Sequence, residues 1–294
     1  MSNFKYVFSE LLKNIKKVGF DLRDLSNENV IHIKKDDCEY LQFRRLLEYN
    51  DVIKHAYGLK PANFNLDIDN DNYTTIETYK KLCDCIGADY NKLIRPNQTH
   101  TNVVKNVDII EKNISIEESK YKETDGLITN KSGVTLASTN ADCILLLFFD
   151  PVKKVIANVH SGWKGTFQKI AINTVKEMIK KYESNPKDII CCICPSIRKC
   201  HFEVEKEVKE MCENIFSYTN KTEKFIEYIG QKDGKDKWVI DTVYINKLML
   251  EEAGLLSENI VDSGICSVCN SDKIHSYRVE GKGFGRGSAV ISLK

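Results

Sequence analysis

Three short polar clusters interrupt the most apolar part of the chain and contain residue types that bind zinc. Each lies at the end of a predicted strand, and they read Gln98-Thr-His100, Ala141-Asp142-Cys143 and Val159-His160-Ser-Gly-Trp163. Two imidazoles and one thiolate suit Zn²⁺, and three protein ligands leave a fourth position open for water or substrate. The sequence therefore predicts a catalytic metal site formed by His100, Cys143 and His160.

Other chemistry is compatible with the same side chains. The three residues lie far apart in the sequence, so no local ligand spacing supports the metal site, and buried, hydrogen-bonded His and Cys side chains are the plain alternative. Cys143 could instead act as a nucleophile with His160 as its base, as in a cysteine hydrolase or amidase. A zinc-stabilised binding protein, with all four metal positions filled, is the non-enzymatic alternative. Metal content and the number of ligands distinguish these cases.

The elements that must position these clusters are strands and helices, with no internal repeat or long linker. Four β-rich runs, at residues 126–129, 134–138, 144–149 and 155–159, predict a sheet core, and the third is apolar without alternation, as in a strand covered on both faces. Further strands are predicted at 52–57, 102–110, 188–194 and 288–293, and helices at 75–86, 163–181, 203–215 and 238–253. We expect one α+β domain of central mixed β-sheets, sandwich-like and flanked by helices.

The first part of the chain has a different pattern. Residues 1–50 are predicted to form an N-terminal helical extension, and residues 51–294 the enzyme domain. Apolar residues recur at helical spacing from Phe4 to Val18 with lysines between them, which indicates an amphipathic helix and neither a signal peptide nor a membrane span. A second helix is expected at residues 40–49.

Composition narrows the range of partners. The chain has 43 basic and 42 acidic residues and a formal charge of +1, so no bulk electrostatic attraction favours nucleic acid or a membrane. Eleven cysteines without a secretory signal indicate a reducing compartment, and we expect a cytoplasmic protein. We expect a monomer or small homo-oligomer that binds small molecules.

Five motifs in a fixed order resemble those of the YfiH-type laccase-domain family, whose members are known as polyphenol oxidases and as purine nucleoside phosphorylases. The motifs are Gln98-Thr-His100-Thr-Asn-Val-Val, Thr124-Asp-Gly-Leu-Ile-Thr129, Thr139-Asn-Ala-Asp-Cys143, His160-Ser-Gly-Trp-Lys-Gly165 and Cys194-Pro-Ser-Ile-Arg-Lys-Cys-His-Phe-Glu-Val204. The resemblance extends from about Asn63 to the C-terminus and includes Ser276-Tyr-Arg278 and Gly285-Arg286.

This resemblance implies that His100, Cys143 and His160 are zinc ligands. It also implies phosphorolysis of adenosine, inosine and related nucleosides to base and sugar 1-phosphate, with adenosine deaminase as a side activity. An open zinc suits both reactions, because it can activate water or stabilise a departing base. Copper, the metal of the older polyphenol oxidase name, is the alternative. Multicopper clusters need many imidazoles, usually in His-x-His pairs, and the six histidines here include no such pair.

Phosphate and substrate need donors besides the metal. The start of the predicted helix at Trp163 and Lys164 has free N–H groups and a dipole that favour anions, and Arg278 and Arg286 add positive charge. Gln98 is a further substrate-binding candidate. The alternative for both arginines is an ordinary surface or structural ion pair.

Four further residues are candidates for proton transfer or catalysis. Asp142 and Glu203 are candidates because they lie close in sequence to the metal motifs, and Arg278 is the third. Asp142 could instead orient a metal ligand. His201 is another acid or base candidate, with a partly buried structural side chain as its alternative.

The chain departs from the family pattern in three places. Residues 55–60, His-Ala-Tyr-Gly-Leu-Lys, replace an arginine-and-glycine signature, Lys164 replaces an arginine, and Glu205 stands where a glycine is usual. A lysine keeps the charge of arginine but loses the planar fork that holds an oxyanion at two points. We therefore expect phosphate affinity or substrate range to differ.

Cysteines outside the three motifs raise the question of a second metal. Cys266-Ser-Val-Cys269 together with Cys191, Cys192 and Cys194 could form a structural zinc site. The alternative is that the last three thiols are small apolar groups within a buried strand.

Overall fold

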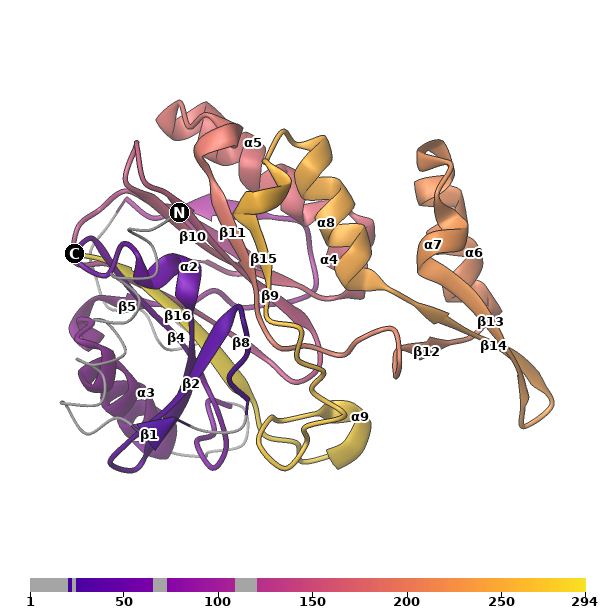
Figure 1. Ribbon diagram of the computed structural model, residues 1–294, viewed down its shortest axis with the longest axis horizontal. Coiled ribbons are helices and arrows are strands. Elements are labelled where there is room, and N and C mark those ends of the chain that lie inside the picture. The colour runs from indigo at the N-terminus through magenta and orange to yellow at the C-terminus, as the bar shows by residue number, and fades with distance from the viewer. Residues whose placement is uncertain (1–20, 23–24, 66–72, 109–120) are drawn as a thin grey trace.

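The computed structural model describes residues 21–22, 25–65, 73–108 and 121–294 (Figure 1). The first of two large sheets is seven-stranded, and only its β5–β8 pair is parallel. Its strands, in spatial order, are β1 (Asp21–Leu22), β2 (Val30–Lys35), β3 (Cys38–Phe43), β4 (Ile53–Gly58), β16 (Gly287–Leu293), β8 (Thr135–Asn140) and β5 (Leu93–Ile94).

The second sheet is six-stranded, with parallel pairs at both edges and antiparallel pairs between them. Its strands, in spatial order, are β15 (Ile260–Asp262), β11 (Ile190–Ile193), β9 (Ile144–Asp150), β10 (Val155–Ser161), β7 (Gly126–Thr129) and β6 (Val104–Asn106). The chain's last strand therefore lies in the first sheet, beside β8, and the chain passes from β8 into the second sheet at the next turn.

The two sheets pack face to face, and helices cover their outer faces. Along β9, Leu145 and Leu147 are buried between the sheets, whereas Leu146 and Phe148 are buried beneath helices, which confirms that this non-alternating run is covered on both faces. The covering helices are α3 (Tyr73–Ile86) on the first sheet and α4 (Trp163–Phe167), α5 (Ile170–Tyr182) and α8 (Thr242–Glu252) on the second (Figure 1). The expected sandwich of mixed sheets flanked by helices is confirmed.

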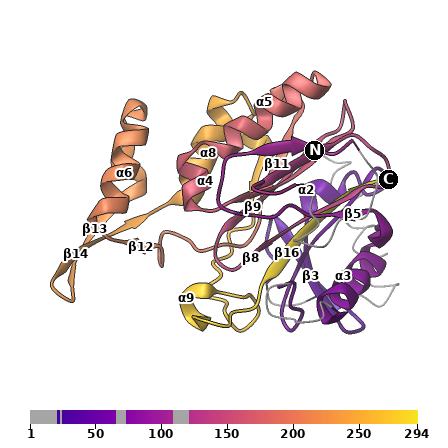
Figure 2. The same cartoon turned by 180° about the vertical axis from the view of Figure 1, so that it is seen from behind.

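A small third sheet forms an arm that extends from this body in both views (Figure 2). Its elements are β12 (Glu203–Val204), α6 (Lys206–Phe216), α7 (Thr222–Phe225), β13 (Ile226–Lys232) and β14 (Lys235–Ile240). The shorter elements elsewhere are α2 (Arg44–Leu47), α9 (Tyr277–Glu280) and the 3₁₀ turns η1 (Tyr90–Lys92), η2 (Pro186–Asp188), η3 (Ser217–Thr219) and η4 (Ser257–Asn259).

The predicted N-terminal helical extension is wrong for the residues that the structure describes. Residues 30–43 form β2 and β3, which pair with each other and join the first sheet through β4. The helix expected at 40–49 shrinks to the four residues of α2. Tyr40 and Leu41 are buried on opposite faces of the sheet, and this two-sided burial resembles helical periodicity in the sequence. The helix expected at residues 4–18 lies outside the described residues.

Three other helix predictions need correction at their ends. The expected helix 163–181 is divided, because Lys169 takes a left-handed conformation with φ 62° between α4 and α5. The expected helix 238–253 begins only at Thr242, since Asp241 caps it by accepting the backbone N–H of Tyr244 at 2.9 Å. Residues 203–204, expected to be helical, form β12. Among the described residues, no helix is both long and apolar enough to span a bilayer.

Candidate metal and substrate site

The three predicted ligands come together at one edge of the sandwich. His160 lies near the end of β10, Cys143 in the turn between β8 and β9, and His100 in the loop before β6. Their ligand atoms all lie within 4.8 Å of one another, and Cys143 Sγ is 3.9 Å from His100 Nε2. The two imidazole rings meet edge to face, with centroids 4.9 Å apart. We call these residues the three-donor cluster, and their donor set fits a zinc ion with an open position.

A buried carboxylate that sequence reasoning missed orients this cluster. Asp125, at the residue before β7, accepts the Nδ1–H of His160 at 2.7 Å, which leaves His160 Nε2 facing the other two donors. The same carboxylate accepts the backbone N–H groups of His100 and Thr101 at 3.1 and 2.7 Å. Such a carboxylate–histidine pair fixes the imidazole tautomer of a metal ligand. An Asp directly before a buried strand, within a motif already singled out, was the available signal.

Electrostatics favour the ionised form of the cysteine. Burial opposes ionisation, but the charge and hydrogen bonds of His160 and His100 prevail and lower the pKa of Cys143 to about 6. Burial likewise opposes the charged form of His160, yet Cys143 and Asp125 raise its pKa to about 9. Thiolate is the form that binds a metal, so the cluster provides the sulfur ligand near neutral pH.

Gly162 packs against all three donors. A Cβ at this position would lie 2.8 Å from His100 Cδ2, 3.2 Å from Cys143 Sγ and 3.3 Å from His160 Cε1. Contacts this short to three separate side chains leave no room for a larger residue. Glycine is therefore required here for close approach to the cluster.

Two side-chain amides hold the ligand-bearing loops together. Gln98 donates to the carbonyl of Thr139 and accepts the N–H of the same residue, both at 2.8 Å, so it joins the His100 loop to the end of β8. Asn140 donates to the carbonyl of Pro195 at 3.0 Å and accepts the hydroxyl of Tyr57 at 2.9 Å. These bonds position the loops and use much of the hydrogen-bonding capacity of Gln98.

A cavity of about 450 Å³ adjoins the three-donor cluster. Such a volume lies within the usual range for a small-molecule site. The cavity is lined by several aromatic residues, two cationic residues and the three donors. The aromatic residues are Trp163, Phe202, Tyr277 and Phe284, and the cationic residues are Arg278 and Arg286.

The predicted substrate and catalytic residues divide into two groups. Gln98, Asp142, Trp163, Arg278 and Arg286 line the cavity.

Lys164 and Glu203 lie outside that lining. The ammonium of Lys164 lies 5.6 Å from the ring centroid of Trp163, and Glu203 pairs with Lys232 and Lys237 in the arm, at 3.5 and 3.6 Å. The carboxylate of Glu203 therefore faces the lysines of the arm. The phosphate site expected at the start of the helix is weakened, because α4 has only five residues and hence a small dipole.

Asp142 holds a loop against the cavity. Its two carboxylate oxygens accept the hydroxyl of Ser267 at 2.6 Å and the backbone N–H of Arg278 at 2.7 Å. Asp142 also has a left-handed backbone, with φ 81°, in the tight turn that presents Cys143. These contacts make it a positioning residue for the Arg278 loop. They differ from the expected role of orienting a metal ligand.

The side chain of Arg278 lines the cavity and is exposed to solvent. Its two terminal nitrogens donate to the carbonyls of His201 and Glu203, at 2.8 and 3.3 Å. A guanidinium has five N–H donors, so three remain for an anionic ligand. His201, an acid or base candidate in the sequence, lies outside the cavity lining and supports Arg278 through its backbone.

The chain belongs to a known family. Residues 50–294 match the family described as multi-copper polyphenol oxidoreductase laccase, which covers most of the sequence. The particular relatives carry other names. Purine nucleoside phosphorylase YlmD of Bacillus subtilis is 30% identical over 79% of this chain and 82% of its own length. Adenosine deaminase RL5, from an unknown prokaryotic organism, is 30% identical over 68% of this chain and 75% of its own length.

Longer relatives and solved structures extend the comparison. Human purine nucleoside phosphorylase LACC1 is 31% identical over 74% of this chain, which spans 47% of that protein. The crystal structure of the Bacillus licheniformis hypothetical protein YfiH superposes with a TM-score of 0.77 and 25% identity, covering 94% of this chain and 99% of that one. Coverage of 94% of this chain includes much of the segment before residue 50, in agreement with its place in the first sheet.

Proposed function

We propose that this chain is a zinc-dependent purine nucleoside phosphorylase that cleaves adenosine- and inosine-type nucleosides with phosphate. The observation that carries the proposal is one cavity that combines the three-donor cluster, two arginines and an aromatic lining. A nucleoside has an aromatic base that can stack on such side chains, and phosphate is a dianion that arginine binds through paired N–H donors. The names of the relatives support the same reaction.

The reaction assigns a task to each part of the cavity. Phosphorolysis breaks the bond between the sugar carbon C1′ and the base nitrogen, forms a bond from C1′ to a phosphate oxygen, and releases the base with a proton. Arg278 and Arg286 would hold the phosphate, while Trp163 and Tyr277 would hold the base. A zinc ion would supply Lewis-acid stabilisation of negative charge, held by the three-donor cluster.

Zinc suits the donor set better than a copper cluster. A multicopper centre requires many imidazoles, and the three-donor cluster contributes two, His100 and His160. The other four histidines lie outside the cavity lining. The proposal therefore keeps zinc despite the name of the family.

Adenosine deamination is proposed as a side activity of the same site. The name of one relative and the open position beside three protein ligands support it, since deamination requires an activated water at the purine ring. A cysteine hydrolase built on Cys143 and His160 would leave His100 without a role, and yet His100 Nε2 lies 3.9 Å from the sulfur of Cys143.

We also propose a reducing, cytoplasmic location for the protein, which its eleven free thiols support.

The test is a screen of zinc-loaded protein against adenosine, inosine and guanosine, with and without phosphate. Free base and sugar 1-phosphate are quantified by chromatography, and inosine formed from adenosine reports deamination. We expect base release that depends on phosphate and disappears in Cys143→Ala. Base release at the same rate without phosphate, or full activity in Cys143→Ala, would overturn the proposal.

A further inference from the structure

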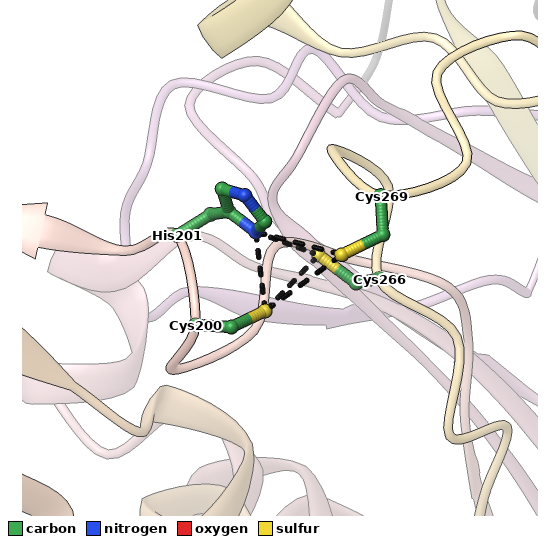
Figure 3. A group of neighbouring side chains, drawn as sticks. All are labelled: Cys200, His201, Cys266 and Cys269. Atoms are coloured by element: carbon green, nitrogen blue, oxygen red, sulfur yellow. Dashed lines mark hydrogen bonds between the residues drawn. The ribbon is translucent and has the colours of Figure 1, made fainter.

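A second group of four donors lies outside the substrate cavity (Figure 3). Cys200 and His201 belong to the turn before β12, and Cys266 and Cys269 to the loop after β15. Their ligand atoms all lie within 4.8 Å of one another, and we call them the four-donor cluster. An isolated bridge between Ser196 and Cys266 brings the two loops together.

This grouping corrects the cysteine set expected from the sequence. Cys191, Cys192 and Cys194 are fully buried in and after β11, where they pack as small apolar groups. Cys266 and Cys269 converge instead on Cys200 and His201, so their partners differ from those predicted.

The distances agree with tetrahedral zinc. Zn–S bonds of about 2.3 Å and Zn–N bonds of about 2.0–2.1 Å place two tetrahedral sulfurs about 3.8 Å apart, and sulfur and nitrogen about 3.6 Å apart. Cys200 Sγ lies 3.7 Å from Cys266 Sγ and 4.0 Å from Cys269 Sγ. His201 Nδ1 lies 3.1, 3.7 and 3.6 Å from the sulfurs of Cys200, Cys266 and Cys269. All four side chains point toward one central position (Figure 3).

The surroundings favour binding of a cation. Cys200 and Cys269 are exposed, so an ion can enter from solvent, while Cys266 is buried at the base of the cluster. The backbone N–H groups of Cys269 and Arg198 point at the sulfur of Cys266. A Cys-x-x-Cys turn whose backbone N–H groups point at a sulfur is typical of zinc-binding turns.

We propose that Cys200, His201, Cys266 and Cys269 bind a second zinc ion in a closed, structural site. Three thiolates and one imidazole complete the tetrahedron, so no position remains for water or substrate. The ion would join the turn before β12 to the loop that continues to Arg278. Arg278 donates to the carbonyl of His201, so the site would hold in place the face of the cavity that carries the arginine.

The first test is a zinc count per chain on protein purified under reducing conditions, with Cys85→Ser as the matched control because Cys85 lies on α3, outside both clusters. We expect about two zinc ions in the wild type and in Cys85→Ser, and about one in Cys143→Ser and in Cys269→Ser. Loss of all zinc in Cys143→Ser, or retention of two ions in Cys200→Ser/Cys269→Ser, would overturn the second site. The zinc count is independent of any nucleoside activity.

A second measurement avoids variants of the four-donor cluster itself. In Cys143→Ser protein loaded with Co²⁺ in place of zinc, three thiolates should give a strong sulfur-to-cobalt absorption band in the near ultraviolet. Absence of this band would contradict the site even if the variants of the four-donor cluster failed to fold.

The competing state of the four-donor cluster is a disulfide between Cys200 and Cys266. If the site binds metal instead, alkylation of denatured, unreduced wild type with a chelator present should label all eleven cysteines. Protection of both Cys200 and Cys266 from alkylation would indicate the disulfide and would overturn the metal site.

Discussion

The two donor clusters use the same residue types but differ in what surrounds them. The three-donor cluster opens onto a cavity of about 450 Å³, and the buried Asp125 orients one of its imidazoles. The four-donor cluster lies outside that cavity, between two loops, with enough ligands to fill a tetrahedron. The difference shows that ligand number and access, and not ligand type, separate a site suited to catalysis from one suited to structure.

The largest expected effect is loss of the three-donor cluster. Cys143→Ala should remove its zinc and reduce phosphorolysis by more than about 1,000-fold, equivalent to about 4 kcal/mol of transition-state stabilisation. Zinc content and free-base release measure the two effects, and the ion of the four-donor cluster should remain. If activity is lost while both ions stay bound, Cys143 acts as a nucleophile and the comparison between the clusters fails.

Removing the orienting carboxylate should have a smaller effect. Asp125→Asn retains the shape but accepts the His160 Nδ1–H less strongly, so zinc affinity or activity should fall about 10–100-fold. Competition with a chromophoric chelator measures the affinity. Thr124→Val is a suitable control, because Thr124 is buried beside Asp125, lies outside the cavity lining and donates its hydroxyl to the carbonyl of Lys122 instead of to a ligand. Equal losses in both variants would mean that Asp125 supports only the fold.

Much of the first cluster could be predicted from the sequence, and little of the second. Cys143 and His160 stand at the ends of strongly apolar strands, and a recognisable order of motifs identified them together with His100. Asp125 was missed because its position directly before a buried strand does not show that its carboxylate faces His160 until the fold brings the two side chains together. Cys200 and Cys266 are brought together by long-range contacts, such as the Ser196 bridge and the bond from Arg198 to the carbonyl of Ile265, that no local spacing encodes.

The secondary structure predicted from the sequence was right for β9 and wrong for β3 and for part of β14. β9 was predicted correctly because six consecutive apolar residues require cover on both faces. β3 was mistaken for a helix because it is also covered on both faces but carries Glu39 and Gln42, which break the apolar run. The last three residues of β14 were assigned to the following helix, since Trp238 and Val239 extend its apolar pattern and the cap at Asp241 is a single-residue signal.

The arginines of the cavity provide a sharper test of substrate chemistry. Arg278→Ala should reduce phosphorolysis by at least about tenfold, equivalent to about 1.4 kcal/mol, and reduce adenosine deamination less, because only phosphorolysis brings a dianion into the site. Lys164→Ala is the matched control, since Lys164 lies outside the cavity lining and should change either rate by less than about twofold. Rates of base and inosine formation are compared at saturating nucleoside. Equal losses in both reactions would assign Arg278 to the fold or to the nucleoside.

The smallest expected effect concerns Glu280, the last residue of α9, in the segment that carries Arg278. Burial opposes its ionised form, but Lys60 at 2.8 Å and the backbone N–H groups of Ser276 and Gly285 lower the pKa of Glu280 to about 2. A carboxylate whose pKa is below its ordinary 4.5 in the folded state adds stability above pH 4.5 and loses that contribution as the pH falls toward 2.

Glu280→Gln should therefore lower the free energy of unfolding at pH 7 by about 1 kcal/mol, because solvent screens part of the interaction of this partly exposed group. The difference in the free energy of unfolding between wild type and variant should narrow as the pH falls from 4.5 toward 2. In this range only the wild type has a carboxylate at position 280 that gains a proton. Urea unfolding of metal-free protein at several pH values measures this free-energy difference. The metals are removed first, so that release of zinc in acid does not add to the measured change in stability. A difference that stays constant over this range would mean that Glu280 acts through packing, and that its carboxylate charge does not hold the segment that carries Arg278.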